Sequence, residues 1–471
     1  MNQTFTQFKE NFYNSFEDAA IFDCGSFNTL KIVLDGLKVN YAKKQKANTF
    51  FLNSWFLYTS QIKIKQKFLW NKKYKKFEQK VFGSKNILNN KKYLIGFSSR
   101  LITEANNKNK SIYYANIIND LGLENTMYIA DADIENILNL GNDFNKNEIY
   151  LAGLLQKFSV GDFELYTELC KTFYTIKQAN IFDKHQLQNI EIAFEMFFKQ
   201  ASIWAKFLEK TTISTAIITV HYHNEGFIYA CKKRGVKVVE LQHGLIAYED
   251  IFYIFPEKVK SVLSKALFAD KILVYGNAWK QRLLRGYEYP ESKIEVLGYY
   301  HYQPKQLSET ERELNAKIEN KKVALFTTQT FMEHNFSKYI QAISNVIPND
   351  YIVIVKPHPS EKIEIYNEYF SNSKNVLIAN CGLDFILSKA TFNVTCYSTT
   401  VFDAMRNNVK TLAINFEQSK DYVSSLVTEN LVIKVEPNQN VFDFVEQLNV
   451  INNEATDWYQ TYNFNVLKNA L

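Results

Sequence analysis

The sequence predicts an α/β protein built from two doubly wound domains that face each other across a cleft, with a C-terminal helix packed back on the first domain. Three observations lead to this prediction. The chain has 471 residues, more than one hydrophobic core normally organises. From residue 211 onward, short apolar runs alternate with segments of helical spacing. All seven prolines lie at or beyond Pro256, so the two halves of the chain differ in composition.

The first strand and helix pair is predicted at 216–242. Residues 216–223 form a short apolar run typical of a buried strand, and 225–235 predict a helix closed by a glycine. Residues 236–242 predict the next strand. A strand, a helix and a strand in a stretch of roughly 30 residues form a βαβ unit, which implies a parallel sheet with a right-handed crossover. Before it, apolar residues at helical spacing dominate 147–210.

The second half repeats this alternation. Its apolar runs are short and nearly continuous, as expected of parallel strands that helices cover on both faces. The predicted strands are 271–276, 294–298, 322–329, 351–359, 375–380, 391–398 and 410–416. We place the linker at 250–270, where Pro256 and a lysine-rich segment interrupt the pattern. This gives one domain at 1–255, a second at 271–440 and a helical tail at 441–471.

The composition is that of a globular protein, at 46% hydrophobic, 22% charged and 15% aromatic residues, with no repeat or low-complexity tract. A net charge of +6 is modest for this length and argues against a dedicated nucleic-acid binder. The five cysteines stand far apart without a CxxC pair. That pattern favours buried thiols in a reducing compartment over a disulfide framework or a zinc site.

The chain is expected in the cytoplasm. Residues 1–10 lack the apolar core of a signal peptide, and no stretch of about 18 apolar residues appears. The segment 63–82 carries eight lysines interleaved with aromatic residues, a composition suited to peripheral contact with the inner face of a membrane. A solvated lysine-rich hairpin is the alternative interpretation. Contact with single-stranded nucleic acid is disfavoured, because no recognised module accompanies the segment.

The strongest candidate for a binding site is the turn Lys356-Pro357-His358-Pro359, directly after a predicted strand. Ligands of open parallel sheets bind outside the carboxyl ends of the strands. The two prolines fix the backbone around His358, and the Lys356 ammonium is suited to neutralising a diphosphate. The alternative is a capped turn in which the histidine satisfies a local carbonyl.

A second candidate is the hydroxyl-rich turn of Ser398, Thr399 and Thr400, between a predicted strand and a helix. Hydroxyl donors and helix-terminal N–H groups together suit a phosphate without a glycine loop. Asp403, one turn into the helix, is placed to accept from a ribose hydroxyl. Plain N-capping of the helix is the alternative for the hydroxyls.

The third candidate lies at the ends of the two strands of the first βαβ unit. His221, His223 and Glu225 follow the first strand, and Gln242 and His243 follow the second. Neighbouring strand ends lie side by side, so these groups are expected to line a common edge and to supply a general base near neutral pH. A structural carboxylate at the helix start and a buried core histidine are the alternatives for Glu225 and His221. No metal site is predicted, since the His-x-His pair lacks a third ligand at a usual spacing.

The Lys-Pro-His-Pro turn followed by the Ser-Thr-Thr turn, in the C-terminal half of a two-domain α/β chain, resembles bacterial GT-B transferases of surface-polysaccharide synthesis. These include sialyltransferases and polysialyltransferases with HP and Ser/Thr motifs, Kdo transferases of capsule synthesis, and teichoic-acid glycerophosphotransferases. The resemblance covers about 217–435 and makes 1–255 the acceptor-side domain and 271–440 the nucleotide-donor-binding domain. It implies that His358 contacts the donor's phosphate or nucleotide and that Ser398 and Thr399 bind its phosphate.

The resemblance also bears on the general base. The Asn-Glu-Gly sequence at 224–226 resembles the acidic-acidic-Gly motif of the sialyltransferases, with asparagine in the first place. The Gln-His-Gly sequence at 242–244 resembles the Trp-His-Gly turn of the glycerophosphotransferases. The base therefore stays open between Glu225 and His243.

The implied function is inverting, metal-independent transfer of a sugar from a nucleotide-activated donor to a glycan or lipid-linked glycan of a capsule, lipopolysaccharide or O-antigen. The expected donor is a CMP-sugar such as sialic acid or Kdo, and no cofactor is expected beyond this substrate. A CDP-polyol phosphotransferase of teichoic-acid-like polymers is the first alternative. A non-catalytic nucleotide- or glycan-binding protein is the second, and a sugar-nucleotide epimerase is a more distant third.

Overall fold

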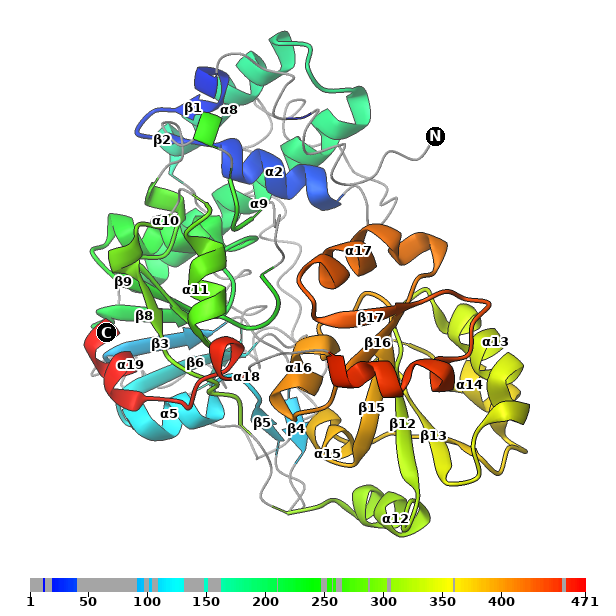
Figure 1. Cartoon of the computed structure of the whole chain (residues 1–471). Helices are drawn as coiled ribbons and strands as arrows, with labels where there is room; N and C mark the ends of the chain where they lie inside the picture. Colours follow the sequence, from blue (N-terminus) through cyan, green and yellow to red (C-terminus); the bar gives the residue numbers. More distant parts are fainter. Residues whose placement is uncertain are drawn as a thin grey trace, which may run out of the picture. The chain divides into compact units, whose positions relative to one another are not determined.

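The computed structural model of the chain describes residues 12, 19–39, 91–96, 101–103, 109–130, 148–150, 162–209, 211–246, 252–255, 257–259, 265–286, 289–302, 306–358, 361–450 and 455–471. The chain forms two compact units (Figure 1). The first comprises Met1–Leu101, Lys110–Tyr302 and Thr461–Leu471, and the second comprises Ile102–Asn109 and Gln303–Gln460.

The first unit contains a seven-stranded parallel sheet in the order β11-β10-β9-β8-β3-β6-β7. In chain order the strands are β3 (Tyr93–Gly96), β6 (Thr126–Ala130), β7 (Glu148–Tyr150), β8 (Thr215–Ile218), β9 (Lys237–Leu241), β10 (Lys271–Val274) and β11 (Ile294–Val296). Every residue of β8 is buried, as expected of a central strand covered on both faces. The strand β7 corrects the prediction that helical spacing holds from residue 147.

The longest helices of the first unit pack through two glycines. The helices are α2 (Leu30–Val39), α5 (Ala115–Leu121), α8 (Phe163–Gln178), α9 (Lys184–Leu208), α10 (Glu225–Lys233) and α11 (Asn277–Leu283). A Cβ at Gly36 in α2 would lie 2.8 Å from the carbonyl oxygen of Asn189, and one at Gly226 in α10 would lie 2.3 Å from that of Phe197. Both carbonyls belong to α9. Glycine at these two positions therefore lets α2 and α10 approach α9 closely. This close packing brings the turn before α10 against α2.

The chain up to residue 302 also contains these short elements: η1 (Ala19–Phe22), β1 (Asp23–Cys24), β2 (Phe27–Asn28), β4 (Leu101–Thr103), β5 (Asn109–Ser111), η3 (Glu257–Val259), η4 (Lys265–Leu267) and η5 (Glu291–Lys293). Strands β1 and β2 form an antiparallel pair, and β4 pairs with β5.

The second unit contains a six-stranded parallel sheet in the order β14-β13-β12-β15-β16-β17. The strands are β12 (Lys322–Thr327), β13 (Tyr351–Lys356), β14 (Val376–Ile378), β15 (Ala390–Thr395), β16 (Thr411–Ile414) and β17 (Val432–Val435). Its helices are α12 (Glu309–Lys317), α13 (Glu333–Ile343), α14 (Ile363–Phe370), α15 (Leu383–Leu387), α16 (Thr400–Arg406) and α17 (Lys420–Thr428), with single turns at η6 (Ser344–Val346), η7 (Glu417–Ser419), η8 (Val441–Phe444) and η9 (Glu446–Val450).

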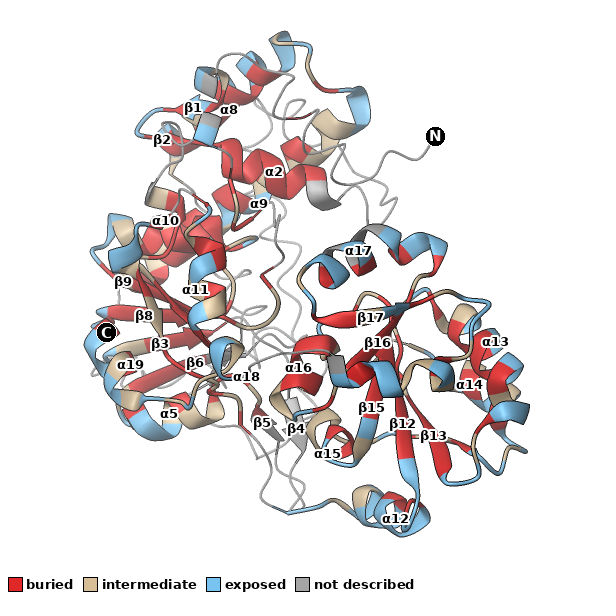
Figure 2. Ribbon diagram, viewed as in Figure 1, coloured by how far each residue is buried: buried red, intermediate tan, exposed pale blue. Residues whose placement is uncertain are grey.

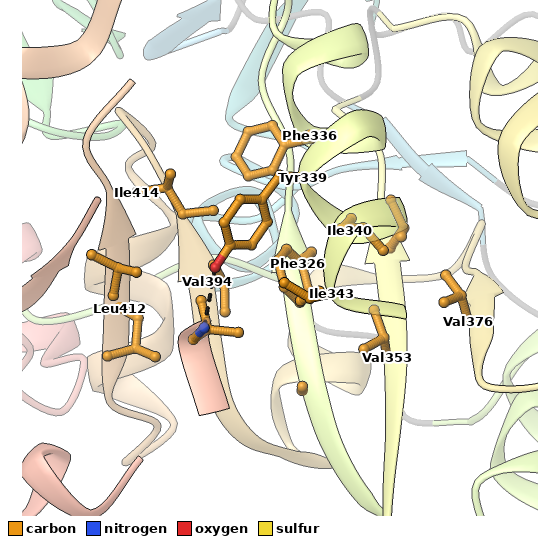
Figure 3. Packing of buried hydrophobic residues seen from close by; sticks show 14 of the residues in the cluster. Phe326, Phe336, Tyr339, Ile340, Ile343, Val353, Val376, Val394, Leu412 and Ile414 are labelled. Carbon is orange, nitrogen blue, oxygen red and sulfur yellow. Dashed lines mark hydrogen bonds between the residues drawn. The ribbon is translucent and has the colours of Figure 1, made fainter. Parts of the chain in front are cut away.

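Helices cover both faces of the second sheet, which makes it doubly wound. One face packs alternate strand residues such as Phe326 and Val353 against α13, whose Phe336, Tyr339 and Ile340 point at the sheet (Figure 3). The intervening strand residues pack on the other face against α12, α15 and α16. The strands are buried while the outward faces of the helices are exposed (Figure 2). Period-two alternation between two apolar layers accounts for the nearly continuous apolar runs of the sequence.

The predicted fold class of two Rossmann-like parallel α/β units is confirmed, and each strand predicted from 216 onward is present. The predicted boundary at 250–270 is wrong. β10 pairs with β9, with Ile272 opposite Glu240, and β11 pairs with β10, so 271–302 belongs to the first unit. The segment 250–270 therefore connects two strands of one sheet and is not a linker between domains. The sequence pattern shows where strands occur, but it does not show which strands pair.

The tail prediction holds for its last segment. Thr461–Leu471 lies with the first unit, where Thr461 bridges Tyr299 and the backbone N–H of Asn463 donates to the carbonyl of Leu297 (2.9 Å). The last helix is α19 (Phe464–Ala470), and it confirms the predicted return to the first domain. Residues 441–460 instead stay with the second unit, where Trp458 of α18 (Ala455–Trp458) packs against Phe402 with tilted rings, 5.1 Å between ring centroids.

Two further sequence predictions concern membranes. Among the described residues no helix is long and apolar enough to cross a bilayer. The basic aromatic segment 63–82 lies outside the described residues, so its proposed membrane contact stays a prediction.

Candidate functional site

The carboxyl ends of β12, β13 and β15 lie side by side in the second unit. The chain runs from β12 to β13 and β14, then returns to β15 on the other side of β12. This reversal of direction is the topological switch point, where open parallel sheets bind ligands. Lys356 and His358 follow β13, and the hydroxyl turn of 398–400 follows β15. The structure therefore brings both predicted motifs to the same edge of one sheet.

The turn that follows β12 joins the two motifs, and the sequence analysis did not single it out. Thr330 Oγ1 lies 3.3 Å from Nδ1 of His358. The hydroxyl of Tyr397 donates to the Thr330 carbonyl over 2.7 Å. Thr330 thus contacts the loop after β13 through its side chain and the loop after β15 through its backbone.

Hydroxyl groups below this turn form an internal network. Thr327 Oγ1 donates to Oδ1 of Asn393 (3.0 Å) and lies 2.7 Å from Oγ1 of Thr400. Ser398 is buried, and its Oγ accepts the backbone N–H of Thr400 over 3.1 Å. Ser398 and Thr400 therefore shape the turn through their own hydrogen bonds, while the N-cap residue of α16, Thr399, makes no side-chain capping hydrogen bond. Thr399 is exposed, so its hydroxyl is the one presented to solvent.

Lys356 ends β13 with its ammonium half-buried. Within the described part of the chain that ammonium makes one hydrogen bond, to the carbonyl of Pro357 (3.2 Å). Burial lowers the pKa of Lys356, and the neighbouring Cys381 and Glu361 only partly oppose the shift. A lysine ammonium has three donors, so this one retains donor capacity beside the hydroxyl-rich turns.

Glu361 braces the same edge. Its carboxylate accepts from Thr328 Oγ1 (2.7 Å), from the backbone N–H of His358 (2.5 Å) and from the Tyr366 hydroxyl (2.9 Å). Burial raises the pKa of Glu361, while these hydrogen bonds oppose the shift. Glu361 thus fixes the backbone at His358 relative to β12.

The predicted donor site also includes Pro359 and Asp403. Pro359 lies outside the described residues. Asp403 is half-buried on α16, where its backbone carbonyl accepts the side-chain amide of Asn407 over 2.9 Å.

In the first unit, the turn between β8 and α10 is built around buried charges. His221 Nδ1 lies 2.7 Å from Glu240 Oε2, and His221 Nε2 lies 2.9 Å from the carbonyl of Phe252. Both ring nitrogens face oxygen acceptors, so the imidazole is held in one orientation. Hydroxyls of Tyr253 (2.6 Å) and Tyr289 (3.2 Å) complete the shell of Glu240. His221 and Glu240 are fully buried, so the structure supports the core-histidine alternative for His221.

Glu225 is also buried and paired. Lys31 of α2 contacts its carboxylate at 2.5 Å and the carbonyl of His221 at 3.3 Å. Burial and the nearby Asp35 carboxylate raise the pKa of Glu225 well above its ordinary value, although Lys31 opposes the shift. Glu225 is therefore enclosed by the protein and paired with Lys31, which leaves its carboxylate out of reach of a substrate hydroxyl.

His223 is the exposed member of this turn. Its backbone N–H donates to Oδ2 of Asp35 (2.7 Å), and its Nδ1 lies 2.9 Å from the same oxygen. Burial alone would raise the pKa of Asp35, but the hydrogen bond and charge of His223 and the charge of Lys31 lower it. The His223 side chain is 47% exposed, and its φ is 62°, a conformation that strains a non-glycine residue. Asp35 thus holds an accessible imidazole in a fixed orientation.

Gln242 and His243 differ in burial, as His221 and His223 do. Gln242 is buried, donates to the Gly244 carbonyl (2.8 Å) and accepts the backbone N–H of Tyr275 (2.9 Å). His243 is half-buried, with Nε2 3.3 Å from the Tyr222 hydroxyl. Gln242 shapes the turn, and the half-buried His243 follows it at the carboxyl end of β9. Within the described ranges, no three His, Cys, Asp or Glu side chains gather as metal ligands would.

Several of these groups escaped the sequence analysis. Lys31 and Asp35 lie four residues apart among apolar residues, and that spacing of opposite charges was the available signal. The Thr-Thr-Gln-Thr run at 327–330 carries three hydroxyls at a strand end, like the motif that was recognised at 398–400.

No family model matches this sequence, and no curated protein matches it. Among solved structures, the chain is similar to S. aureus MnaA in a co-structure with UDP, with 16% identity, 79% of this chain and 92% of that chain covered, and a TM-score of 0.48. It is also similar to the UDP-GlcNAc 2-epimerase of Neisseria meningitidis bound to UDP-GlcNAc (14% identity, 80% and 99% covered, TM-score 0.48) and to MurG of Acinetobacter baumannii (9%, 77% and 91%, 0.41). The chain's own topology, two parallel-sheet units with a last helix returned to the first, is of the GT-B type.

Proposed function

We propose that this chain is a glycosyltransferase that binds its nucleotide-activated sugar at the carboxyl edge of β12, β13 and β15. The observation that carries the proposal is Lys356. A half-buried ammonium with a single described hydrogen bond stands at the switch point, between two turns rich in hydroxyls. Glu361 lies near enough to oppose part of this pKa shift, but Lys356 forms no direct ion pair with a described residue, and a phosphate would supply one.

The neighbouring groups fit a phosphate ester of a nucleotide. Lys356 would neutralise charge on the phosphate that departs with the nucleotide. His358, with its backbone fixed by Glu361, and the exposed Thr399 would supply directional hydrogen bonds. In this proposal the transfer is inverting and metal-independent, with Lys356 carrying the role that a metal ion has in other enzymes.

The donor and acceptor follow from the resemblance of the two motifs. We propose a CMP-sugar such as sialic acid or Kdo as donor and a surface glycan of a capsule, lipopolysaccharide or O-antigen as acceptor. The segment 63–82 would bring a lipid-linked acceptor close if its predicted membrane contact is real. Each of these assignments is a prediction for donor and acceptor screening.

For the general base we propose His223, in place of Glu225. A carboxylate on Nδ1 orients an imidazole so that Nε2 can take a proton from a hydroxyl. His223 has that arrangement with Asp35, whereas Glu225 is enclosed with Lys31. His243 is the second candidate, because it is half-buried at the end of the neighbouring strand.

The donor site is tested with a thermal-shift panel of CMP, CDP, UDP and GDP. A ligand that binds the folded state raises its apparent stability. We expect at least one nucleotide to raise the melting temperature of the wild type and to have little effect on Lys356→Gln. Lys374→Gln, an exposed lysine before β14, is the matched control and should respond like the wild type. If no nucleotide stabilises the wild type, or if Lys356→Gln responds fully, the proposal is wrong.

The base is tested with the donor that the panel identifies. Asparagine adopts left-handed backbone readily, so His223→Asn keeps the turn and removes the imidazole. We expect kcat to fall by about 100-fold or more with nucleotide affinity unchanged. His185→Asn, an exposed histidine on α9, should leave kcat unchanged. A His223→Asn variant with full kcat would shift the assignment to His243.

A CDP-polyol phosphotransferase is the second candidate function. The observation in its favour is His243, half-buried at the end of β9 in a Gln-His-Gly turn that resembles the glycerophosphotransferase turn. Mass spectrometry of the product distinguishes the two, because one adds a sugar and the other adds a phosphopolyol.

A further inference from the structure

Phe331 occupies a backbone position that disfavours it. The N–H of Met332 donates to the carbonyl of Gln329 over 3.0 Å and closes a four-residue turn directly after β12. Phe331 is the third residue of this turn, with a φ of 72°. Turns with a positive φ at the third residue favour glycine or asparagine there, and a bulky residue is strained.

Packing does not compensate for this strain. The Phe331 side chain is 82% exposed, the largest fraction among the exposed large apolar side chains of the described residues. Phe326 and Phe336, on either side along the chain, are fully buried in the core of the second unit (Figure 3). Of the described non-glycine residues with positive φ, four are asparagines, and the other, His223, is held by Asp35.

The turn is nevertheless firmly anchored. Thr330, the residue before Phe331, contacts His358 through its side chain and accepts the Tyr397 hydroxyl through its carbonyl. Met332 and Phe336 are buried beneath it. A rigid support therefore presents an exposed aromatic ring beside the loops proposed to bind phosphate, which is where the base of a bound nucleotide needs a flat apolar partner.

We propose that Phe331 is the stacking platform for the base of the bound nucleotide. The inference rests on the proposed function and adds the residue that holds the nucleoside end of the donor. An aromatic face stacks on any base, so Phe331 would contribute affinity with little choice between pyrimidines and purines. Strain at this position then persists because the ring contacts ligand rather than protein.

The test is a calorimetric titration of the nucleotide found by the thermal-shift panel, and of inorganic pyrophosphate, into wild type and Phe331→Ala. We expect the variant to bind the nucleotide about tenfold more weakly, since stacking of one base contributes on the order of 1–3 kcal/mol. The affinity for pyrophosphate should not change. Phe331→Tyr should restore nucleotide affinity, and Val346→Ala, an exposed apolar residue of the same unit, should match the wild type.

A second readout reports the contact itself. In Phe331→Trp, the nucleotide should quench the fluorescence of the added tryptophan, whereas pyrophosphate should not. Equal nucleotide affinity in wild type and Phe331→Ala would overturn this inference and leave the proposed donor site standing. A parallel loss of pyrophosphate affinity would also overturn it, because the residue would then act by shaping the turn. A wild type that binds no nucleotide would overturn the proposed function and this inference together.

Discussion

His223 and Phe331 occupy matching places in the two units. Each stands in the turn between a central parallel strand and the next helix, β8 and α10 in one unit and β12 and α13 in the other. Each has a positive φ, and among the described residues they are the two that do so without being glycine or asparagine. Their neighbours differ: the carboxylate of Asp35 pairs with His223, whereas the residue before Phe331, Thr330, contacts His358 and the Tyr397 hydroxyl.

The charges of the first unit are paired with one another. Lys31 meets Glu225, His221 meets Glu240, and Asp35 meets His223. Burying these ions is costly, and their pairing recovers that cost only in a fixed geometry. The arrangement therefore specifies one conformation of the turn and leaves His223 as the accessible group.

The edge of the second unit retains unused hydrogen-bonding capacity. Lys356 makes one hydrogen bond to a described residue, and the hydroxyl of Thr399 and the ring of Phe331 face solvent. The difference between the two edges indicates a division of labour. Under the proposed function, the first unit fixes the general base, and the second keeps polar and aromatic groups for the nucleotide.

The same substitution in both units should have opposite effects on stability. Lys31→Met removes one partner of a buried pair and should cost about 3–5 kcal/mol of unfolding free energy, towards the lower end because Glu225 can take up a proton. Lys356→Met removes a half-buried ammonium that forms no direct ion pair with a described residue, and it should raise stability by about 1 kcal/mol. Urea denaturation read out by peptide-level hydrogen exchange separates the two units.

Lys322→Met is the control for this pair, because Lys322 and Asp350 form an exposed ion pair whose loss should leave the unfolding free energy nearly unchanged. Equal destabilisation by Lys31→Met and Lys356→Met would contradict the contrast between the two edges.

The two glycines of the resemblance motifs should respond differently to alanine. A Cβ at Gly226 would lie 2.3 Å from the Phe197 carbonyl oxygen, so α10 must move away from α9, at about 1–3 kcal/mol. A Cβ at Gly244 meets nothing within 4 Å, so Gly244→Ala should change stability by under about 0.5 kcal/mol. Thermal unfolding of both variants measures the difference. A tolerated Gly226→Ala would show that the turn before α10 does not depend on this close packing.

Acid should destabilise the first unit through Glu240. Burial raises the pKa of this carboxyl, but the charge of His221 and the hydrogen bonds from His221 and Tyr253 outweigh it and hold the pKa below 4.5. A lowered folded-state pKa contributes stability that is present above the unfolded value and lost as pH falls through the folded value. Each unit of lowering corresponds to about 1.4 kcal/mol.

The measurement is the pH dependence of the unfolding free energy, followed by tryptophan fluorescence because Trp204 and Trp279 are buried in the first unit. The wild type should lose stability below pH 4.5 more steeply than Glu240→Gln, which lacks the titrating group. Parallel curves for the two proteins would show that Glu240 is not the origin of acid sensitivity.

The architecture could be predicted from sequence because its signals are local. Continuous apolar runs mark each parallel strand of the second unit except β17, and the Lys-Pro-His-Pro turn marks the end of β13. Pairing is not local. Whether β10 joins β9 or a new sheet depends on contacts across the fold, and so the domain boundary was misplaced.

The candidate site shows the same difference between local signals, which the sequence reveals, and non-local contacts, which it does not. Lys356 and His358 were found because they follow a strand directly. Asp35 could not be connected with His223, because 188 residues separate the two along the chain. Phe331 was missed for another reason: strain and exposure are properties of the folded backbone, and the sequence shows only one phenylalanine among many.

Hydrogen exchange of the wild type with and without saturating nucleotide tests the division of labour most directly. The account predicts slower exchange in peptides covering 327–333, 356–362 and 396–402 of the second unit, with little change over 219–226 and 237–245 of the first. Protection confined to the first unit's turns would contradict the account, since it would place the nucleotide among the buried charges rather than at Lys356.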